Sequence, residues 1–258
     1  MSTLAAVIIT CNEEKNIARC LRSLQAVADE IVVVDSGSTD RTAEICRSFG
    51  VKFVSQPWLG YGAQKNFADT LATGDWRLSL DADEELSAAL RRSILAVKES
   101  ASADAYACNR HTNYCGRWIN HCGWYPDAKI RLWKNGAARW SLDAVHEKVE
   151  LAPGATVKHL AGDLLHYTCA TVEEHLAVAN RYTTLKAGSY AAQHKTASLA
   201  QILVAPAWCF FHDYVWRRGF LDGYYGLVIC AVAAFSTFIK YVKLRQMNAG
   251  ENSAATPD

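Results

Sequence analysis

The stretch of sequence that decides the fold is LAAVIITCNEEKNIARCLRSLQAVADEIVVVDS, residues 4–36. Leu4–Thr10 and Glu30–Asp35 are short runs of mostly apolar, often β-branched residues, as expected of strands buried on both faces. Between them, from Asn12 onward, apolar residues recur at the spacing of an amphipathic helix. A strand, a helix and a strand in this order predict a right-handed crossover in a parallel sheet.

The same alternation continues through the first hundred residues. We expect a helix over Thr39–Phe49, a strand over Val51–Val54, a helix over Ala63–Leu71 and a strand over Trp76–Leu80. This order predicts an α/β fold of the Rossmann-like type, in which a mostly parallel sheet carries helices on both faces.

The second half has a different texture. Residues 105–158 are rich in Trp, Tyr, His and Cys and contain many turn residues, which predicts short, partly antiparallel strands. A helix is expected over Val172–Ala192. Leu199–Lys243 is apolar and aromatic, and the residues from 249 onward are expected to form a disordered tail.

Composition argues against several classes of protein. The chain has 258 residues, a net charge of +1 and no long basic run, so a nucleic-acid partner is not expected. Its nine cysteines are scattered and odd in number, unlike a disulfide framework. The N-terminus runs straight into the first predicted strand without a secretory signal, so we expect a cytoplasmic protein.

The cysteines suggest one metal site that we consider and set aside. Cys108, Cys115 and Cys122 recur every seventh residue, with His111 and His121 nearby. This spacing fits no standard zinc module, and buried thiols are the favoured interpretation.

Polar side chains follow the clearest strands at the points where they end. Thr10 ends the first strand and is followed by Asn12 and Glu13, Asp35 ends the second, and Asp81 follows the fourth. Because ligands bind beyond the carboxyl ends of the strands in open parallel sheets, we expect these residues to line a ligand site.

Asp81 and Asp83 are the strongest single signal of chemistry. If both continue the fourth strand, their side chains lie on the same side of the sheet. Two carboxylates this close repel each other unless a cation is near, and Mg²⁺ or Mn²⁺ also keeps coordination positions for phosphates. The alternative is that Asp83 caps a helix beginning near Glu84 or Ser87.

Five motifs resemble those of known enzymes. VIITCNEEKNI (7–17), VVVDSGSTDRT (32–42) and WRLSLDADEEL (76–86) resemble, in this order, family 2 glycosyltransferases of the GT-A fold. GWYPDAKIRLWKNGAARWSLDAVHEKV (123–149) and PAWCFFHDYVWRRGFLDGYYG (206–226) are similar to a narrower group, the lipopolysaccharide core β-glucosyltransferases. The resemblance implies a metal-dependent hexosyltransferase that uses a nucleotide-sugar.

The resemblance also implies residues that bind the nucleotide-sugar. Thr10, Asn12 and Glu13 would line the nucleotide pocket, and Asp35 would bond the uracil or the ribose. Lys65 follows a glycine-containing loop that lacks the ending of a phosphate loop. It either faces the diphosphate or is an ordinary lysine on a helix surface.

The remaining site residues implied by the resemblance are carboxylates and one histidine. Asp83 would be the principal ligand of Mg²⁺ or Mn²⁺, and Asp81 would contact the metal or the ribose. His166 would be a further ligand of the metal or the diphosphate. Glu147 is the expected catalytic base, and Asp143 is its rival.

These roles together describe an inverting transfer. We expect a hexose, glucose from UDP-glucose, to pass to the inner core of a lipid A-linked saccharide. Arg131 or Lys129 either adds positive charge for a phosphorylated acceptor or is a solvated surface residue. Alternative acceptors are a polyprenyl phosphate and a capsular glycan, and a non-catalytic nucleotide-sugar-binding module is the alternative outside enzymes.

The C-terminal region suggests a membrane surface as a partner. Tyr224–Ile239 contains no charged residue but is shorter than the roughly twenty apolar residues that a span takes. We expect membrane-associated helices that dock on the anionic inner leaflet, which makes the protein peripheral (monotopic) on the inner membrane. A buried helical hairpin or an oligomer interface is the alternative.

The expected domain organisation follows from these assignments. The parts are a nucleotide-sugar-binding half (1–104), an acceptor-binding half (105–195), the membrane-associated helices (196–248) and the tail (249–258).

Overall fold

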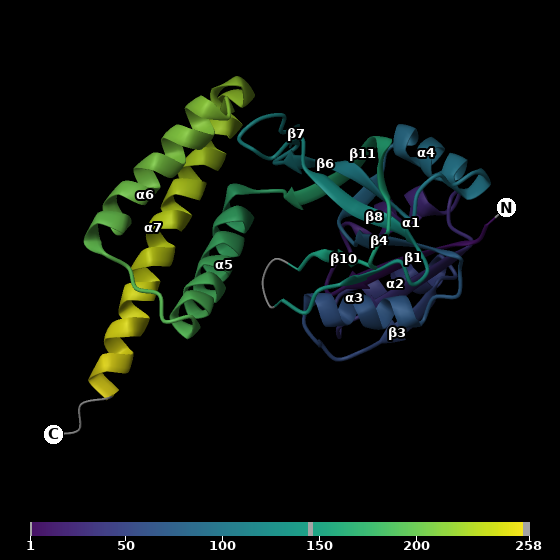
Figure 1. Cartoon of the computed structure of the whole chain (residues 1–258), viewed down its shortest axis with the longest axis horizontal. Coiled ribbons are helices and arrows are strands. Elements are labelled where there is room, and N and C mark those ends of the chain that lie inside the picture. Colours follow the sequence, from purple (N-terminus) through teal and green to yellow (C-terminus); the bar gives the residue numbers. More distant parts are fainter. Residues whose placement is uncertain (1, 144–146, 255–258) are drawn as a thin grey trace. The chain divides into compact units, whose positions relative to one another are not determined.

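The computed structural model describes residues 2–143 and 147–254 of the chain. The chain divides into two compact units, which we call unit 1 (Met1–His111 and Pro126–Tyr167) and unit 2 (Thr112–Tyr125 and Thr168–Asp258). Unit 1 contains most of a mixed sheet with its helices, and unit 2 contains the C-terminal helices (Figure 1).

Unit 1 is built from alternating strands and helices followed by further strands. The strands are β1 (Leu4–Thr10), β2 (Glu30–Asp35), β3 (Lys52–Ser55), β4 (Trp76–Asp81), β5 (Glu84–Leu86), β6 (Ala105–Tyr114), β8 (Ala128–Lys134), β9 (Ala138–Trp140), β10 (Val149–Leu151) and β11 (Val157–Cys169). The helices are α1 (Ile17–Leu24), α2 (Thr42–Ser48), α3 (Tyr61–Thr70) and α4 (Ala88–Glu99). Strands β6 and β11 run on into unit 2, where β7 (Arg117–Trp118) pairs with β6.

The main sheet has the strand order β3-β2-β1-β4-β8-β6-β11-β5. Its first four strands are parallel, which confirms the parallel sheet predicted from the alternating pattern. Strand β8 pairs antiparallel with β4 and with β6, and β11 pairs antiparallel with β5. The sheet is therefore mixed, with the antiparallel strands contributed largely by the region where the sequence predicts them.

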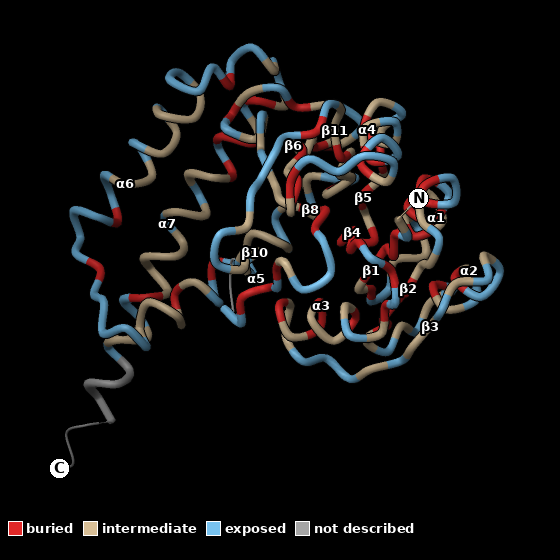
Figure 2. The backbone as a smooth tube through the Cα atoms, turned by 45° about the vertical axis from the view of Figure 1, so that its right-hand side comes forward, coloured by how far each residue is buried: buried red, intermediate tan, exposed pale blue. Residues whose placement is uncertain are grey.

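The parallel strands β1, β2 and β4 are buried on both faces, as their continuous apolar runs predict (Figure 2). On one face Ile8 packs in a cluster that contains Leu21 of α1 and Leu90 of α4. On the other face Val7 packs with Ala68 of α3. Helices thus cover both faces, and the sheet edge between these layers is where β1, β2 and β4 end.

Most predicted elements are found close to their predicted limits. Strands β1 and β2 and the helix Val172–Ala192 have the predicted bounds. The helix predicted over Thr39–Phe49 is shorter, since α2 begins at Thr42. The preceding Asp40 side chain accepts a hydrogen bond from the Thr42 backbone N–H at 2.9 Å, so the chain before the helix forms a turn.

Unit 2 is mainly helical. Its helices are α5 (Val172–Ala192), α6 (Leu199–Phe211), a short π-helical turn η1 (His212–Trp216), a 3₁₀ turn η2 (Gly219–Asp222) and α7 (Gly223–Ala254). Thr171 caps α5 by accepting a bond from the Glu174 N–H at 3.1 Å, and Ser198 and Gln201 form a capping box at the start of α6. Helix α7 continues to Ala254, so the disorder predicted from residue 249 is wrong for residues 249–254, and residues 255–258 lie outside the described residues.

One helical stretch of unit 2 meets the requirements for a membrane span by length and composition. It runs over Gly219–Ala249, and its most apolar window has a mean hydropathy of 1.8. Only 22% of that window is buried within the protein, so most of it is not a soluble-protein core (Figure 2).

Strand β11 approaches α4 closely at a glycine. Gly162 has a φ of +94°, and a Cβ there would overlap the backbone nitrogen of Leu90. Gly154 has a similar φ of +81°, but a Cβ there would meet nothing within 4 Å. A side chain at either position would strain the backbone, but only one at Gly162 would also overlap another part of the chain. Comparing substitutions at the two glycines therefore distinguishes backbone strain from steric overlap.

We predict that Gly162→Ala lowers the free energy of unfolding more than Gly154→Ala. The positive φ alone costs about 1–2 kcal/mol for a residue with a Cβ, and the overlap with α4 adds about 1–3 kcal/mol. Urea unfolding followed by circular dichroism measures both. Equal losses for the two variants would contradict the close approach of β11 to α4.

Candidate active site

The carboxyl ends of β1, β2 and β4 lie side by side. In the sheet register Thr10 is level with Asp35, and Ile9 is level with Asp81. Thr10, Asp35 and Asp81 therefore meet at one edge of the sheet, as the sequence predicts. The Thr10 hydroxyl is buried and has no hydrogen-bond partner among the described residues, which leaves it available to a ligand.

Asn12 and Asp35 shape the two loops at this edge. Asn12 Oδ1 accepts bonds from the backbone N–H and hydroxyl of Thr39 at 2.8 and 3.3 Å, and the Asn12 N–H donates to Ser38 Oγ at 2.8 Å. The Asp35 carboxylate accepts bonds from the N–H groups of Gly37 and Ser38 at 3.0 and 2.9 Å and from the Ser38 hydroxyl. Both side chains thus fix the two loops at this edge of the sheet.

Glu13 adds negative charge to the edge. Its carboxylate accepts a bond from Asn16 Nδ2 at 2.9 Å, and its backbone N–H donates to Thr42 Oγ1 at 2.8 Å. Burial raises the pKa of Glu13, and the carboxylates of Asp83 and Asp81 raise it further, against the lowering effect of the Asn16 bond. This crowding of carboxylates favours a cation at the edge.

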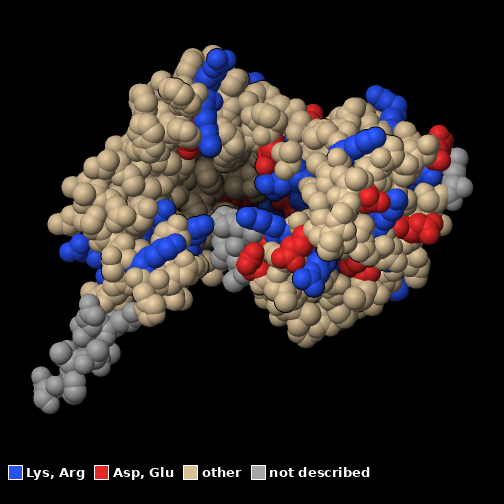
Figure 3. All heavy atoms as spheres, in the orientation of Figure 1, with Lys and Arg blue, Asp and Glu red and all other residues tan. Residues whose placement is uncertain are grey.

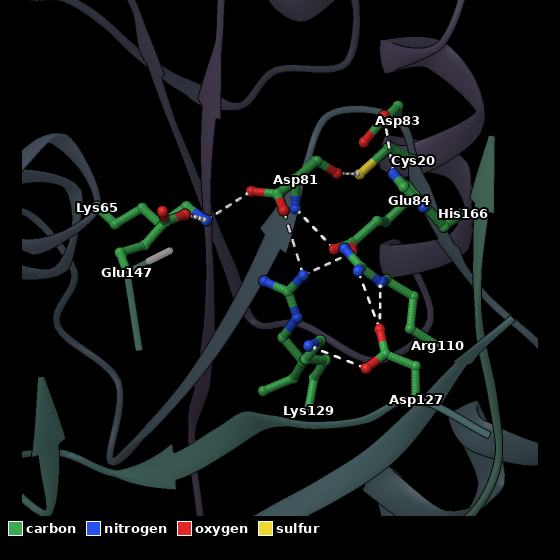
Figure 4. Close-up of polar contacts among 11 residues, drawn as sticks. Cys20, Lys65, Asp81, Asp83, Glu84, Arg110, Asp127, Lys129, Glu147 and His166 are labelled. Carbon is green, nitrogen blue, oxygen red and sulfur yellow. Dashed lines mark hydrogen bonds and ion pairs between the residues drawn. The ribbon is translucent and has the colours of Figure 1, made fainter. Parts of the chain in front are cut away.

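Asp81 lies between two cations of the protein itself (Figure 4). Its Oδ1 is 2.9 Å from Lys65 Nζ, and its Oδ2 is 3.2 Å from Arg131 Nη2. Arg131 Nη2 also lies 2.5 Å from the buried Glu84 carboxylate, which accepts a bond from the Asp81 N–H at 2.9 Å. Burial would raise the pKa of Asp81, but Lys65 and Arg131 outweigh it and hold that pKa well below its usual range.

Arg131 is not the solvated surface residue considered from the sequence, because only 4% of it is exposed. Its Nε and Nη1 groups are buried and have no hydrogen-bond partner among the described residues, and the same is true of Trp140 Nε1. Unpaired buried donors are costly unless a ligand accepts their bonds. Lys129, the other candidate, lies 2.9 Å from Asp127 Oδ1.

Lys65 connects Asp81 to the expected catalytic base. Its Nζ donates to Glu147 Oε1 at 3.1 Å and lies 4.2 Å from the centre of the Trp140 ring. Only 5% of the Lys65 side chain is exposed, so the helix-surface alternative is wrong. The neighbouring Asn66 exchanges two hydrogen bonds with the Trp140 backbone, each of 2.9 Å, and so holds β9 against α3.

Asp83 does not lie on the fourth strand, contrary to the sequence prediction. Strand β4 ends at Asp81, and Asp83 stands in the turn before β5. Asp83 is not a helix cap either, because Ser87 caps α4 by accepting a bond from the Leu90 N–H at 3.2 Å. The turn instead places Asp83 Oδ2 3.2 Å from His166 Nε2 (Figure 4).

The position of His166 comes from the sheet. It lies on β11, which pairs antiparallel with β5. This pairing sets His166 opposite Glu84, the residue after Asp83, and so brings His166 close to Asp83. Burial lowers the pKa of His166, but the bond to the Asp83 carboxylate outweighs it, and the imidazole pKa is raised.

Asp83 and His166 fit two positions around a divalent cation. Adjacent ligands of an octahedral ion with bonds of about 2.1 Å lie about 3.0 Å apart, close to the observed 3.2 Å. Within residues 2–143 and 147–254 no group of three His, Cys, Asp or Glu side chains is placed to hold a metal. An ion at Asp83 and His166 would therefore need further oxygens from substrate or water.

Asp143 lies outside this network. It is exposed and accepts a bond from the Ser141 hydroxyl at 3.0 Å. Residues 144–146, which separate it from Glu147, are outside the described residues. Of the two candidate bases, Glu147 is the one that contacts Lys65 and through it Asp81.

Sequence reasoning missed the pairing of Glu84 with Arg131. The two residues belong to motifs quoted above but lie 47 positions apart, and they meet because β8 pairs with β4. The sequence offers no local signal for this contact. The one indication in the sequence is that Arg131 lies among the apolar residues of a strand, where a charged side chain needs an ionic partner.

The comparison with known proteins identifies the family. Residues 5–141 match the family model described as "Glycosyl transferase family 2". The chain belongs to this family. Together with the mixed sheet and its helices, the match assigns the GT-A fold to unit 1, as the sequence motifs predict.

Two relatives align with nearly the whole chain. An "Uncharacterized glycosyltransferase" of Rickettsia bellii is 34% identical over 97% of this chain and 89% of its own length. The "Lipopolysaccharide core biosynthesis glycosyltransferase LpsC" of Rhizobium meliloti is 32% identical over 96% of this chain and 95% of its own. Among solved structures, S. aureus TarS in complex with UDP is 14% identical, with a TM-score of 0.48, over 96% of this chain and 92% of that one.

We predict that Arg131→Met strongly destabilises the protein. It leaves the Glu84 carboxylate buried without its cation, a change that costs about 3–5 kcal/mol. Guanidinium unfolding gives the free energy of unfolding.

The matched comparison is the double variant Arg131→Met/Glu84→Gln, which removes both charges and should recover part of the loss. If the double variant is as unstable as the sum of the two single ones, the pair does not stabilise unit 1.

Proposed function

We propose that this glycosyltransferase moves a hexose, glucose from UDP-glucose, to the inner core of a lipid A-linked saccharide with inversion at the anomeric carbon. The observation that carries the proposal is the linked set Asp81, Lys65 and Glu147 at the carboxyl edge of the parallel strands, together with the Asp83–His166 pair that begins on the turn after β4. Support for the acceptor class comes from the full-length similarity to a lipopolysaccharide core biosynthesis enzyme.

The donor is proposed to lie across this edge. The free Thr10 hydroxyl and the loops shaped by Asn12 and Asp35 would meet the nucleoside, with Glu13 beside them. Asp81 is proposed to contact the ribose rather than a metal, because both of its oxygens already face cations. Lys65 is proposed to face the donor's diphosphate.

The proposed divalent cation is Mg²⁺ or Mn²⁺. Asp83 and His166 would hold it, and when bound it would offset the charge of the departing diphosphate. The protein contributes a fixed carboxylate and imidazole on the turn after β4 and on β11, so these two ligands need little rearrangement.

Glu147 is proposed to take the proton from the attacking acceptor hydroxyl. In this structure Lys65 holds one of its oxygens at 3.1 Å, which fixes the carboxylate near Asp81. Departure of the nucleoside diphosphate requires no proton, so a single carboxylate suffices as base. Asp143 is the rival because it is close in sequence, although it lacks the contact with Lys65.

The proposed organisation follows the sequence. Residues 1–104 would bind the donor, 105–195 the acceptor, and 196–248 would lie on the cytoplasmic surface of the inner membrane. The helical stretch Gly219–Ala249 and its exposed apolar side chains support the membrane part. A lipid-linked acceptor would bring the reacting sugar to that surface.

The acceptor is tested by direct assay. Purified protein with UDP-glucose and Mn²⁺ should glucosylate a lipid A-linked core saccharide and give a β-linked product, measured by mass spectrometry and NMR. Polyprenyl phosphate and a capsular glycan are the competing acceptors. Transfer to either of these and not to the core would overturn the acceptor assignment while leaving the family activity intact.

The metal assignment is tested on binding as well as turnover. UDP should raise the melting temperature of the wild type more with Mn²⁺ than with EDTA. Asp83→Asn and His166→Gln should weaken Mn²⁺ binding, so that each variant needs about tenfold or more Mn²⁺ for the same rise in melting temperature. An unchanged Mn²⁺ dependence in both variants would exclude these residues as ligands.

The base is tested by matched amide variants. Glu147→Gln should reduce turnover about a hundredfold or more, the usual contribution of a general base, while UDP-glucose binding persists. Asp143→Asn and the exposed Glu150→Gln serve as controls and should retain most turnover. If Asp143→Asn loses turnover and Glu147→Gln does not, the two roles are exchanged.

A further inference from the structure

The helices of unit 2 carry basic residues without acidic ones over long stretches. Residues 175–212 and 223–249 contain no Asp or Glu. These stretches cover most of α5, all of α6 and the described side chains of α7. Their basic residues gather towards the end of α5 and the second half of α7: Arg181, Lys186, Lys195, Lys240, Lys243 and Arg245. Figure 3 shows blue but no red spheres over the lower part of these helices.

Three of the lysines surround one aromatic ring. The Nζ atoms of Lys195, Lys240 and Lys186 lie 4.5, 5.7 and 5.8 Å from the centre of the Tyr190 ring. Lys240 is also 4.3 Å from the ring centre of Tyr241. We call Lys195 and Lys240 the Tyr190 lysines.

The fold holds this arrangement in place. After α5 the chain turns back, with the Lys195 N–H bonded to the Tyr190 carbonyl at 3.0 Å. Asn248 Nδ2 of α7 donates to the Lys195 carbonyl at 3.0 Å, and Tyr190 packs against the buried Leu244 cluster. The turn therefore brings Lys195 to the ring that Lys240 approaches from α7.

Lys243 is a lysine of these helices whose ammonium group has hydrogen-bond partners within the protein. Its Nζ donates to the carbonyl and Oδ1 of Asn180 at 2.9 and 2.7 Å and to the hydroxyls of Thr183 and Thr184 at 2.9 and 2.7 Å. The Tyr190 lysines instead contact an aromatic face, a weak interaction that leaves their mutual repulsion largely uncompensated. Phosphate oxygens would relieve that repulsion with charge-assisted hydrogen bonds.

The same helices expose large apolar side chains. On α6 Leu203 is 70% exposed and Trp208 62%, and on α7 Phe235 is 54% exposed. Helices that expose apolar side chains and carry lysines without carboxylates over these stretches are complementary to an anionic bilayer, which offers acyl chains and phosphates.

We propose that the Tyr190 lysines bind the phosphate of an anionic membrane phospholipid while the exposed apolar side chains of α6 and α7 enter the acyl region. The proposal rests on the membrane association proposed above and adds the site that recognises the headgroup. It does not depend on the sugar, the metal or the catalytic base.

The test uses the full chain and vesicles of phosphatidylcholine with and without phosphatidylglycerol, with binding measured by flotation. Wild-type protein should bind the anionic vesicles more tightly, and added salt should weaken this binding. Lys195→Gln/Lys240→Gln should bind them about thirtyfold more weakly, because each lysine near a charged surface contributes about a fivefold effect. Lys195→Arg/Lys240→Arg, which keeps the charges, should bind like the wild type.

The matched control removes two exposed charges from unit 1. Arg22→Gln/Arg92→Gln alters the net charge equally and should leave anionic-vesicle binding within about twofold. Equal loss in this control would mean that net charge alone drives binding, and would overturn the site. Urea unfolding of each variant separates loss of binding from loss of folding.

The remaining outcomes are also decisive. Equal binding of the glutamine variant and the wild type would overturn the headgroup site while leaving membrane association in place. Thermal stabilisation by millimolar inorganic phosphate as large as that by anionic vesicles would reassign the site to a soluble anion. Absence of binding to either vesicle would overturn both membrane statements, whereas a failed glucosyl transfer with intact vesicle binding would overturn only the proposed reaction.

Discussion

The ion pairs of Asp81 are the interaction on which the site and its surroundings depend. A carboxylate at the end of a buried strand needs positive charge close by, and two different parts of unit 1 supply it. Lys65 comes from α3, which covers one face of the parallel strands, and Arg131 comes from β8, the first antiparallel strand. Because Arg131 also neutralises Glu84, the same contacts that organise the polar edge hold the parallel and antiparallel parts of the sheet together.

What could be predicted from the sequence is what is encoded locally. β1 and β2 were recoverable because buried parallel strands need continuous apolar runs, and Thr10, Asp35 and Asp81 could be placed because parallel strands end at a common edge. The turn at Asp83 was missed, since alternation along a strand says nothing about where the strand ends. The environment of Arg131 was missed because it depends on strand pairing across the sheet.

His166 illustrates a different limit. It lies more than eighty residues after Asp83, and neither periodicity nor spacing in the sequence relates the two. Only the family resemblance suggested that they act together. The structure supplies the physical reason, which is the antiparallel pairing of β11 with β5 and the glycine that lets β11 approach α4. Because no third His, Cys, Asp or Glu among the described residues joins this pair, oxygens of substrate or water would complete any coordination sphere there.

The absence of carboxylates from long stretches of α5–α7 has an electrostatic consequence for the molecule as a whole. The net charge of +1 suggests a nearly neutral particle, yet acidic residues outnumber basic ones in unit 1 and the reverse holds in unit 2. The isoelectric point is therefore a poor guide to how the protein meets a charged surface. A negatively charged surface therefore attracts unit 2 and repels unit 1, so the long-range field selects which unit approaches it first.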